Sequence, residues 1–182
     1  MGSLLDAIGA VAIGGILLVS MITTLYMMQA NGNNLNSLIT LMQISEDVSS
    51  AIDSLYLSKV GLGVTSSSPI VATSSNSFEF LTKNPVTNLT DTIKIIQESA
   101  DVWGYPLSVY RNSVLELGPF SLKDSLDFIF YDRSETVTTT VDSIRSVKMT
   151  AEFTSPAIPT TSSLVNVNNK IIIWRYFKNL YI

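Results

Sequence analysis

A block of almost wholly apolar residues at positions 4–30 constrains this chain more than any other feature. It contains one charge, Asp6, and no Lys or Arg precedes Lys59. About 25 apolar residues form a helix long enough to cross the ~30 Å hydrocarbon core of a bilayer. A secretory signal or signal anchor normally starts with positive charges, so either a basic leader has been removed or this helix is buried among copies of itself. Both explanations predict an exported, self-assembling protein.

The composition argues against several classes of function. The 182 residues fit one domain plus the N-terminal segment. The net charge is −4 with Lys and Arg scattered singly, which argues against nucleic-acid binding. The absence of Cys and His excludes disulfides, thiol chemistry, Cys/His zinc sites and imidazole acid–base catalysis. No carboxylate pair stands out and no EF-hand spacing is present, so we expect no enzyme activity, no cofactor and no metal.

The N-terminal region predicts one long helix from Met1 to Leu57. Residues 1–30 form its transmembrane or filament-core part, and residues 31–60 form an amphipathic half with apolar positions at helical spacing. One face of this half carries Leu38, Leu41, Met42, Ser45, Val48, Ile52, Leu55 and Tyr56. The turn-like cluster at 31–34 (NGNN) leaves open whether the helix is kinked there. An unbroken helix of about 54 residues spans ~80 Å, so we expect it to protrude.

Residues 61–182 predict a globular domain made of an antiparallel β-sheet with Ser/Thr-rich loops, so the fold class is α+β. After a Gly/Ser/Thr-rich connection at 61–77, apolar and polar residues alternate as in strands with one buried face. The predicted strands are 77–82, 92–97, 107–111, 114–117, 125–132, 146–154 and 170–177, with 136–141 as a further strand or a flap. The sequence RNS at 111–113 predicts a tight hairpin turn, and residues 155–163 predict a loop.

Short motifs in this domain follow a familiar order. An aromatic group at Phe128, Phe130, Tyr131 and Asp132 precedes Ile144, Arg145, Val147 and Lys148, and the chain closes on Lys178, Asn179 and Leu180. Behind a long helix that is apolar and then amphipathic, this order resembles the type IV pilin and pseudopilin superfamily. The likeness is to minor pilins of the PilW type and pseudopilins of the J type. It covers the architecture of the whole chain.

The resemblance implies a subunit that assembles through its N-terminal helix. It implies that Asp6 replaces the glutamate near the start of the family's helices, and that N-terminal processing concerns Met1 and Gly2. The implied partners are copies of this chain in a helical homopolymer, the pilus or secretion assembly machinery, and the cytoplasmic membrane before assembly. The helix proline and the cysteine pair common in the family are absent here, and Gly14-Gly15 supplies the weak point instead.

Two features of the apolar block each carry two interpretations. Asp6 either pairs with the terminal amine of a neighbouring subunit or serves as an N-terminal helix carboxylate at the bilayer surface. Gly9, Gly14 and Gly15 either allow close helix packing in a filament core or are ordinary small residues of a transmembrane segment. The density of small residues between positions 7 and 15 favours packing.

Two loop motifs are further candidates. Asn88-Leu89-Thr90 fits a glycosylation acceptor on a surface loop, and such tripeptides also arise by chance. The sequence WGYP at 103–106, following Asp101, is similar to a turn in some pseudopilins; the alternative is an aromatic loop that caps the sheet.

Three functions are therefore weighed. The first is a structural subunit of an extracellular type IV pilus-like filament at the cell surface, with a membrane-inserted precursor. The second keeps the fold and makes the chain a minor pilin or a type II secretion pseudopilin, which its copy number in a filament would decide. The third, from another class, is a single-pass membrane-anchored binding module that stays monomeric in detergent.

Overall fold

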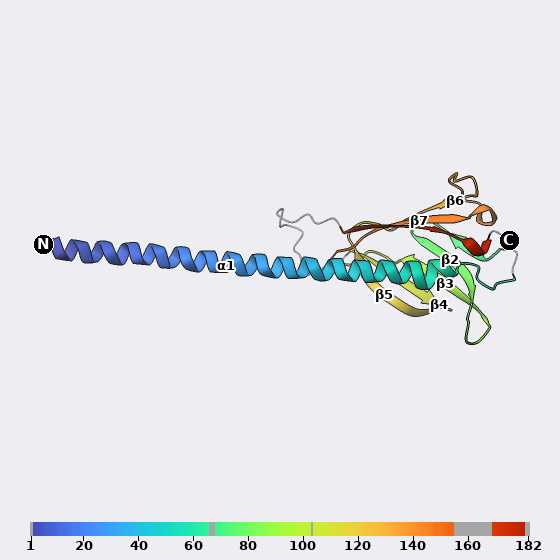
Figure 1. Ribbon diagram of the computed structural model, residues 1–182, viewed down its shortest axis with the longest axis horizontal. Helices are drawn as coiled ribbons and strands as arrows, with labels where there is room; N and C mark the ends of the chain where they lie inside the picture. Colours follow the sequence, from blue (N-terminus) through green and yellow to red (C-terminus); the bar gives the residue numbers. More distant parts are fainter. Residues whose placement is uncertain (1, 66–67, 103, 155–168, 181–182) are drawn as a thin grey trace. The chain divides into compact units, whose positions relative to one another are not determined.

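The computed structural model describes residues 2–65, 68–102, 104–154 and 169–180; in the first turns of the helix the side chains of residues 2 and 4–6 lie outside this description. The chain divides into two compact units, Met1–Ile39 and Thr40–Ile182. One long N-terminal helix and antiparallel sheets confirm the α+β class (Figure 1).

The helix α1 runs without interruption from Gly2 to Ala51. The turn-like cluster at 31–34 and the Gly14-Gly15 pair both lie inside it, so neither breaks the helix. A glycine lowers helix stability by about 1 kcal/mol relative to alanine and an asparagine by less. Because helix formation is cooperative, flanking helical turns on both sides outweigh such local penalties.

The helical segment ends in two irregular turns, a π-helical turn η1 (Ile52–Tyr56) and a 3₁₀ turn η2 (Leu57–Lys59). From Leu41 onwards one face of the helix enters the core of the second unit, and Val48, Ile52 and Tyr56 are buried there. The predicted inward face is wrong for Met42 and Leu55, each of which is 51% exposed. The apolar pattern is wider than the stripe that the sheets cover.

In the described part of the chain the strands form two antiparallel sheets rather than the single sheet expected (Figure 1). The five-stranded sheet has the order β1-β2-β3-β4-β5 and the three-stranded sheet the order β6-β7-β8. The strands are β1 (Ile70–Thr73), β2 (Ser77–Lys83), β3 (Thr90–Gln97), β4 (Tyr105–Arg111), β5 (Val114–Leu122), β6 (Asp127–Tyr131), β7 (Ser146–Glu152) and β8 (Lys170–Tyr176). Two more 3₁₀ turns, η3 (Val141–Ser143) and η4 (Lys178–Leu180), flank β7 and β8 in sequence.

Alternation along the strands decides which side chains enter the core. In β2 the buried side chains are Phe78, Phe80 and Thr82, with half-buried or exposed residues between them. In β7 the same period buries Val147, Met149 and Ala151, as the sequence predicts. The hairpin turn between β4 and β5 is also confirmed, because Asn112 (φ 49°) and Ser113 (φ 67°) take the left-handed pair of a type I′ turn.

Two segments differ from the prediction, and at 136–141, predicted as a strand or a flap, the strand alternative is excluded. The connection at 61–77 contains β1, whose Ile70 is 3% exposed and belongs to the core. The segment 136–141 forms no strand and makes one isolated bridge between Val137 and Tyr131. The strand predicted at 114–117 continues through Gly118 and Pro119 to Leu122.

A cluster of phenylalanines forms the centre of the core. The ring of Phe78 lies 5.1 Å from Phe80, 6.0 Å from Phe128, 5.1 Å from Phe130 and 5.8 Å from Phe177, measured between ring centroids. These residues come from β2, from β6 and from the segment after β8, so the cluster joins the two sheets. Aromatic pairs at such distances stabilise a core beyond the area they bury.

Candidate assembly segment and surface sites

The apolar part of α1 presents large hydrophobic side chains on all its sides. The most exposed are Ile8, Val11, Ile13, Ile16, Leu17, Leu18, Val19, Met21, Ile22, Leu25, Tyr26, Met27 and Met28, each between 57% and 76% exposed. Since these include runs of consecutive positions, they do not form a single stripe. Among the described residues, one helix is long and apolar enough to cross a membrane, and it contains this segment. It has the length and composition of a membrane anchor or a signal sequence.

The three glycines of this segment have empty space around them. At Gly9, Gly14 and Gly15, a Cβ atom built on the backbone would meet no described atom within 4 Å apart from the local helix itself. None of them has the positive φ angle that favours glycine. Within the described chain, therefore, neither packing nor backbone conformation requires glycine at these positions.

The predicted roles of Asp6, Met1 and Gly2 remain predictions. Gly2 begins α1 and Asp6 lies in its second turn, but the side chain of Asp6 is outside the described structure, as is the whole of Met1. Among the described residues, no group of three or more His, Cys, Asp or Glu side chains is placed to hold a metal ion.

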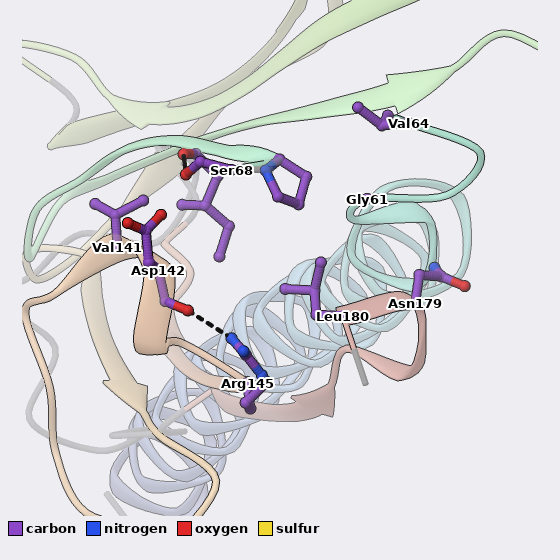
Figure 2. Close-up of a pocket in the computed structure, with 10 residues that line it drawn as sticks. Gly61, Val64, Ser68, Val141, Asp142, Arg145, Asn179 and Leu180 are labelled. Atoms are coloured by element: carbon purple, nitrogen blue, oxygen red, sulfur yellow. Dashed lines mark hydrogen bonds between the residues drawn. The ribbon is translucent and has the colours of Figure 1, made fainter. Parts of the chain in front are cut away.

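A surface pocket of about 340 Å³ lies in the second unit (Figure 2). It is lined by Gly61, Val64, Ser68, Pro69, Ile70, Val141, Asp142, Arg145, Asn179 and Leu180. These residues belong to three segments: the stretch from the turn after η2 to the start of β1, the 3₁₀ turn η3 with the two residues that follow it, and the C-terminal turn η4. The pocket thus lies where three segments distant in sequence come together.

The basic and amide side chains of this pocket bind backbone groups. Arg145 donates from Nη1 to the carbonyl oxygens of Asp142 and Ile144, each at 2.8 Å, the first of which is drawn in Figure 2. Asn179 donates from Nδ2 to the carbonyl oxygens of Ser58 (3.4 Å) and Val60 (3.0 Å). The last carbonyl groups of a helix lack intrahelical hydrogen-bond donors. Asn179 donates to two carbonyls at this end and thereby connects the C-terminal turn η4 to the end of the helical segment.

Gly61 shows how closely these segments approach. Its φ of +70° favours glycine, and an added Cβ would lie 2.6 Å from Cδ2 of Leu180. The geometry indicates a structural joint between these segments.

Several residues of the pilin-like motifs build the fold. Phe128, Phe130, Ile144 and Val147 are buried in the core. Asp132 accepts hydrogen bonds at Oδ1 from the amides of Ser134 and Thr136, at 2.8 and 3.0 Å, which fixes the turn after β6. In this chain these motif residues stabilise the core and its turns, and Arg145, Asn179 and Leu180 of the same motifs line the pocket.

Asp91 is a buried acidic residue with three side-chain hydrogen-bond partners, and sequence reasoning missed it. It is 5% exposed and accepts hydrogen bonds from Asn84 (2.9 Å), Arg111 (2.8 Å) and Asn112 (2.8 Å). The hydrogen bonds from Asn112 and Arg111 hold the pKa of the Asp91 carboxyl below its ordinary value. Arg111 also binds Glu116, with Nε 3.0 Å from Oε2. The cluster ties the two ends of neighbouring hairpins together, which no local pattern in the sequence signals.

The outer face of the three-stranded sheet carries a row of stacked aromatic rings. Trp174 lies 5.1 Å from Tyr131 and 6.5 Å from Tyr176 between ring centroids, and Nζ of Lys148 lies 6.0 Å from its ring. Tyr176 donates to Oε1 of Glu135 at 2.9 Å. The period-two pattern of 170–177 is the signal that could have placed Trp174 and Tyr176 on one face.

The predicted acceptor Asn88 lies in the exposed loop between β2 and β3, with φ 58°. Trp103, part of the other loop motif, lies outside the described residues.

No protein-family model, no curated protein and no solved structure matches this chain. The architecture of a long apolar N-terminal helix followed by antiparallel sheets is loosely pilin-like.

Proposed function

We propose that this chain is a structural subunit of an extracellular type IV pilus-like filament that assembles through packing of its N-terminal helices. Before assembly the apolar part of α1 resides in the cytoplasmic membrane. In the filament the second unit, Thr40–Ile182, here called the sheet unit, faces the solvent. The partners are further copies of the chain together with assembly machinery. No enzymatic step is part of this function.

The observation that carries the proposal is that three glycines with open space around them, Gly9, Gly14 and Gly15, lie close together in the apolar segment. Each glycine lowers the stability of a helix interior by about 1 kcal/mol relative to alanine, and no contact within the described chain offsets this. Small residues allow the backbones of apolar helices to approach closely where lipid offers no hydrophobic gain. Contacts with helices outside the chain would explain why glycine stands at these positions.

The proposal also gives a role to Asp6. A carboxylate in an apolar environment is unfavourable unless a positive group pairs with it. In the filament, Asp6 pairs with the terminal amine of a neighbouring subunit and thereby sets the register. Asp6→Ala should therefore reduce assembly, whereas Asp6→Glu, which keeps the carboxylate, should retain it.

The test compares glycine substitutions inside and outside the apolar segment. Gly14→Leu places a bulky side chain at the proposed helix contact, whereas Gly32→Leu makes the same change in the same helix beyond that segment, also in open space. Filaments sheared from the producing cells are sedimented, and the chain in them is compared with the total cellular amount. We expect a loss of about tenfold or more for Gly14→Leu and a change within about twofold for Gly32→Leu, because close packing does not tolerate added volume.

Equal filament yields from the two variants and the unchanged chain would refute the proposed packing. A chain that appears only as a monomer in detergent, with no filament fraction, would favour the membrane-anchored binding module. A few copies per filament would favour the minor-pilin or pseudopilin alternative, which shares the same helix packing.

A further inference from the structure

The loop between β2 and β3 is held in shape by hydrogen bonds of its own. The amide of Asn84 donates to the carbonyl of Leu89 (2.8 Å), and the amide of Asn88 donates to the carbonyl of Asn84 (2.9 Å). The side-chain oxygen of Asn84 accepts from the amides of Val86 (2.9 Å) and Thr87 (3.3 Å). The loop is therefore an ordered projection that presents its remaining side chains outwards.

Three asparagines of the second unit use their side-chain amides to hold the fold. The Nδ2 groups of Asn84 and Asn112 donate to Asp91, and that of Asn179 donates to backbone carbonyls. Asn88 differs, because its side chain is exposed and makes no hydrogen bond to any residue that the structure describes. Its amide nitrogen is available for chemistry at the surface.

Asn88 is also the acceptor position of a glycosylation sequon. Asn88-Leu89-Thr90 has the form Asn-x-Thr with x other than proline, and the printed sequence contains this tripeptide pattern once. Thr90 begins β3 and is exposed, and its hydroxyl has no hydrogen bond among the described residues. Both residues that a glycosyltransferase recognises are thus on the surface of one short loop.

The apolar neighbours of Asn88 give a second, independent observation. Val86 is 87% exposed and Leu89 is 68% exposed. Two exposed apolar side chains on a projecting loop lower the solubility of this surface. A bulky hydrophilic glycan beside them would shield them from solvent and raise its solubility.

We propose that Asn88 carries an N-linked glycan. The Nδ2 nitrogen forms a bond to the anomeric carbon of the first sugar, and the amide loses one proton. The donor is a glycan linked to a polyprenyl phosphate or pyrophosphate, whose bond from the anomeric carbon to the phosphate oxygen breaks as the lipid phosphate leaves. This inference rests on the proposed function in one respect, the export of the sheet unit across the membrane.

The test uses the full chain purified from the cells that produce it, analysed by intact mass and by the mass of the peptide that contains Asn88. We expect the unchanged chain to carry added hexose-type mass on that peptide. Asn88→Gln and Thr90→Ala should both lose this mass completely. Thr90→Ser is the matched control, because it keeps the hydroxyl of the sequon and should keep the glycan. A thermal melt of each variant checks that the sheet unit is folded.

An unmodified Asn88 in the unchanged chain would overturn the inference, and so would a modification that persists in Thr90→Ala. The masses are measured separately on the membrane fraction and on sheared filaments. Filaments built from chains with unmodified Asn88 would reject the glycan and leave the proposed function standing. Glycosylated chains in the membrane of cells without filaments would support the glycan and reject the filament function.

Discussion

The two units of this molecule contain similar apolar residues and place them in opposite environments. In the sheet unit Phe78, Phe80 and Ile95 are fully buried, whereas in the helical unit Val11 is 76% exposed and Leu17 is 65% exposed. Burying such a side chain contributes about 1.5–3 kcal/mol. The sheet unit therefore obtains its hydrophobic stabilisation from its own chain, whereas in the helical unit these side chains stay exposed within the described chain. In the proposed function, lipid and then other copies of the chain cover them.

Removing one large apolar side chain from each unit should have very unequal effects on stability. Phe78→Ala should lower the free energy of unfolding of the sheet unit by about 3–5 kcal/mol, because it leaves a cavity among four phenylalanine rings. Leu17→Ala in the exposed segment should change it by less than about 0.5 kcal/mol. Guanidinium denaturation of the full chain in detergent micelles, followed by near-ultraviolet circular dichroism, measures both. Similar losses in both variants would contradict the comparison.

A smaller effect tests whether the polar interior of the sheet unit is as self-contained as its apolar core. Asp91→Ala removes one of the two acidic partners of Arg111 and the acceptor for the side-chain amides of Asn84 and Asn112, which should lower the free energy of unfolding by about 2–3 kcal/mol. The control is the ion pair of Lys123, whose side chain is 47% exposed, with Glu152, whose side chain is 13% exposed; Lys123→Ala should lower the free energy of unfolding by much less than Asp91→Ala does. A loss in Lys123→Ala as large as in Asp91→Ala would show that burial does not set the effect.

The pH dependence of the same cluster has a definite sign. The folded-state pKa of Asp91 is lowered by hydrogen bonds from Asn112 and Arg111, so its contribution to stability is complete above its ordinary pKa of about 3.9 and disappears as the pH falls through the folded-state value. Denaturation midpoints measured from pH 5 down to pH 2 should therefore fall more for the unchanged chain than for Asp91→Asn. Identical acid profiles for the two chains would contradict this assignment.

The smallest effect is expected at the end of the helical segment. Asn179→Ala removes the hydrogen bonds to the carbonyls of Ser58 and Val60 and should destabilise the sheet unit by about 1 kcal/mol. Amide hydrogen exchange should increase at residues 57–60 and in η4, and it should stay unchanged in β2 and β3. Faster exchange spread evenly over both sheets would show that Asn179 contributes to the whole core and not to this joint alone.

Much of the fold could be predicted because its signals are local. The apolar block at 4–30 predicts the long helix, the alternation in 146–154 predicts β7, and Asn112 with Ser113 predicts a tight turn. In each case the residue types of one short segment determine the structure of that segment. The residues of β1 were missed because Ile70 follows Pro69 in a Ser/Thr-rich stretch that looks like a loop, and its strand exists through pairing with β2.

The remaining features depend on contacts between distant segments. The division into two sheets and the hydrogen-bonded cluster around Asp91 follow from how the strands pair. The exposure of Met42 follows from which helix face the strands cover. The segment 136–141 has strand-forming residues, yet it makes one bridge to β6 and then turns into η3. Of the candidate sites, the sequence alone predicts the apolar segment and Asn88, whereas the pocket around Arg145 and Asn179 arises from three separate parts of the chain.

The bulge in β5 at Gly118 and Pro119 affects how the edge of the five-stranded sheet can pair with another strand. In the described part of the molecule β5 is an edge strand, and opposite Ser108 it carries two residues where a regular ladder has one, because Leu117 pairs with Val109 and Phe120 with Leu107. An added Cβ on Gly118 would lie 2.5 Å from the carbonyl oxygen of Leu107, so this bulge requires glycine. Pro119 lacks an amide hydrogen and is tolerated there because the strand lies at an edge. A strand from another molecule therefore meets an interrupted row of donors at this edge, which disfavours uncontrolled sheet extension.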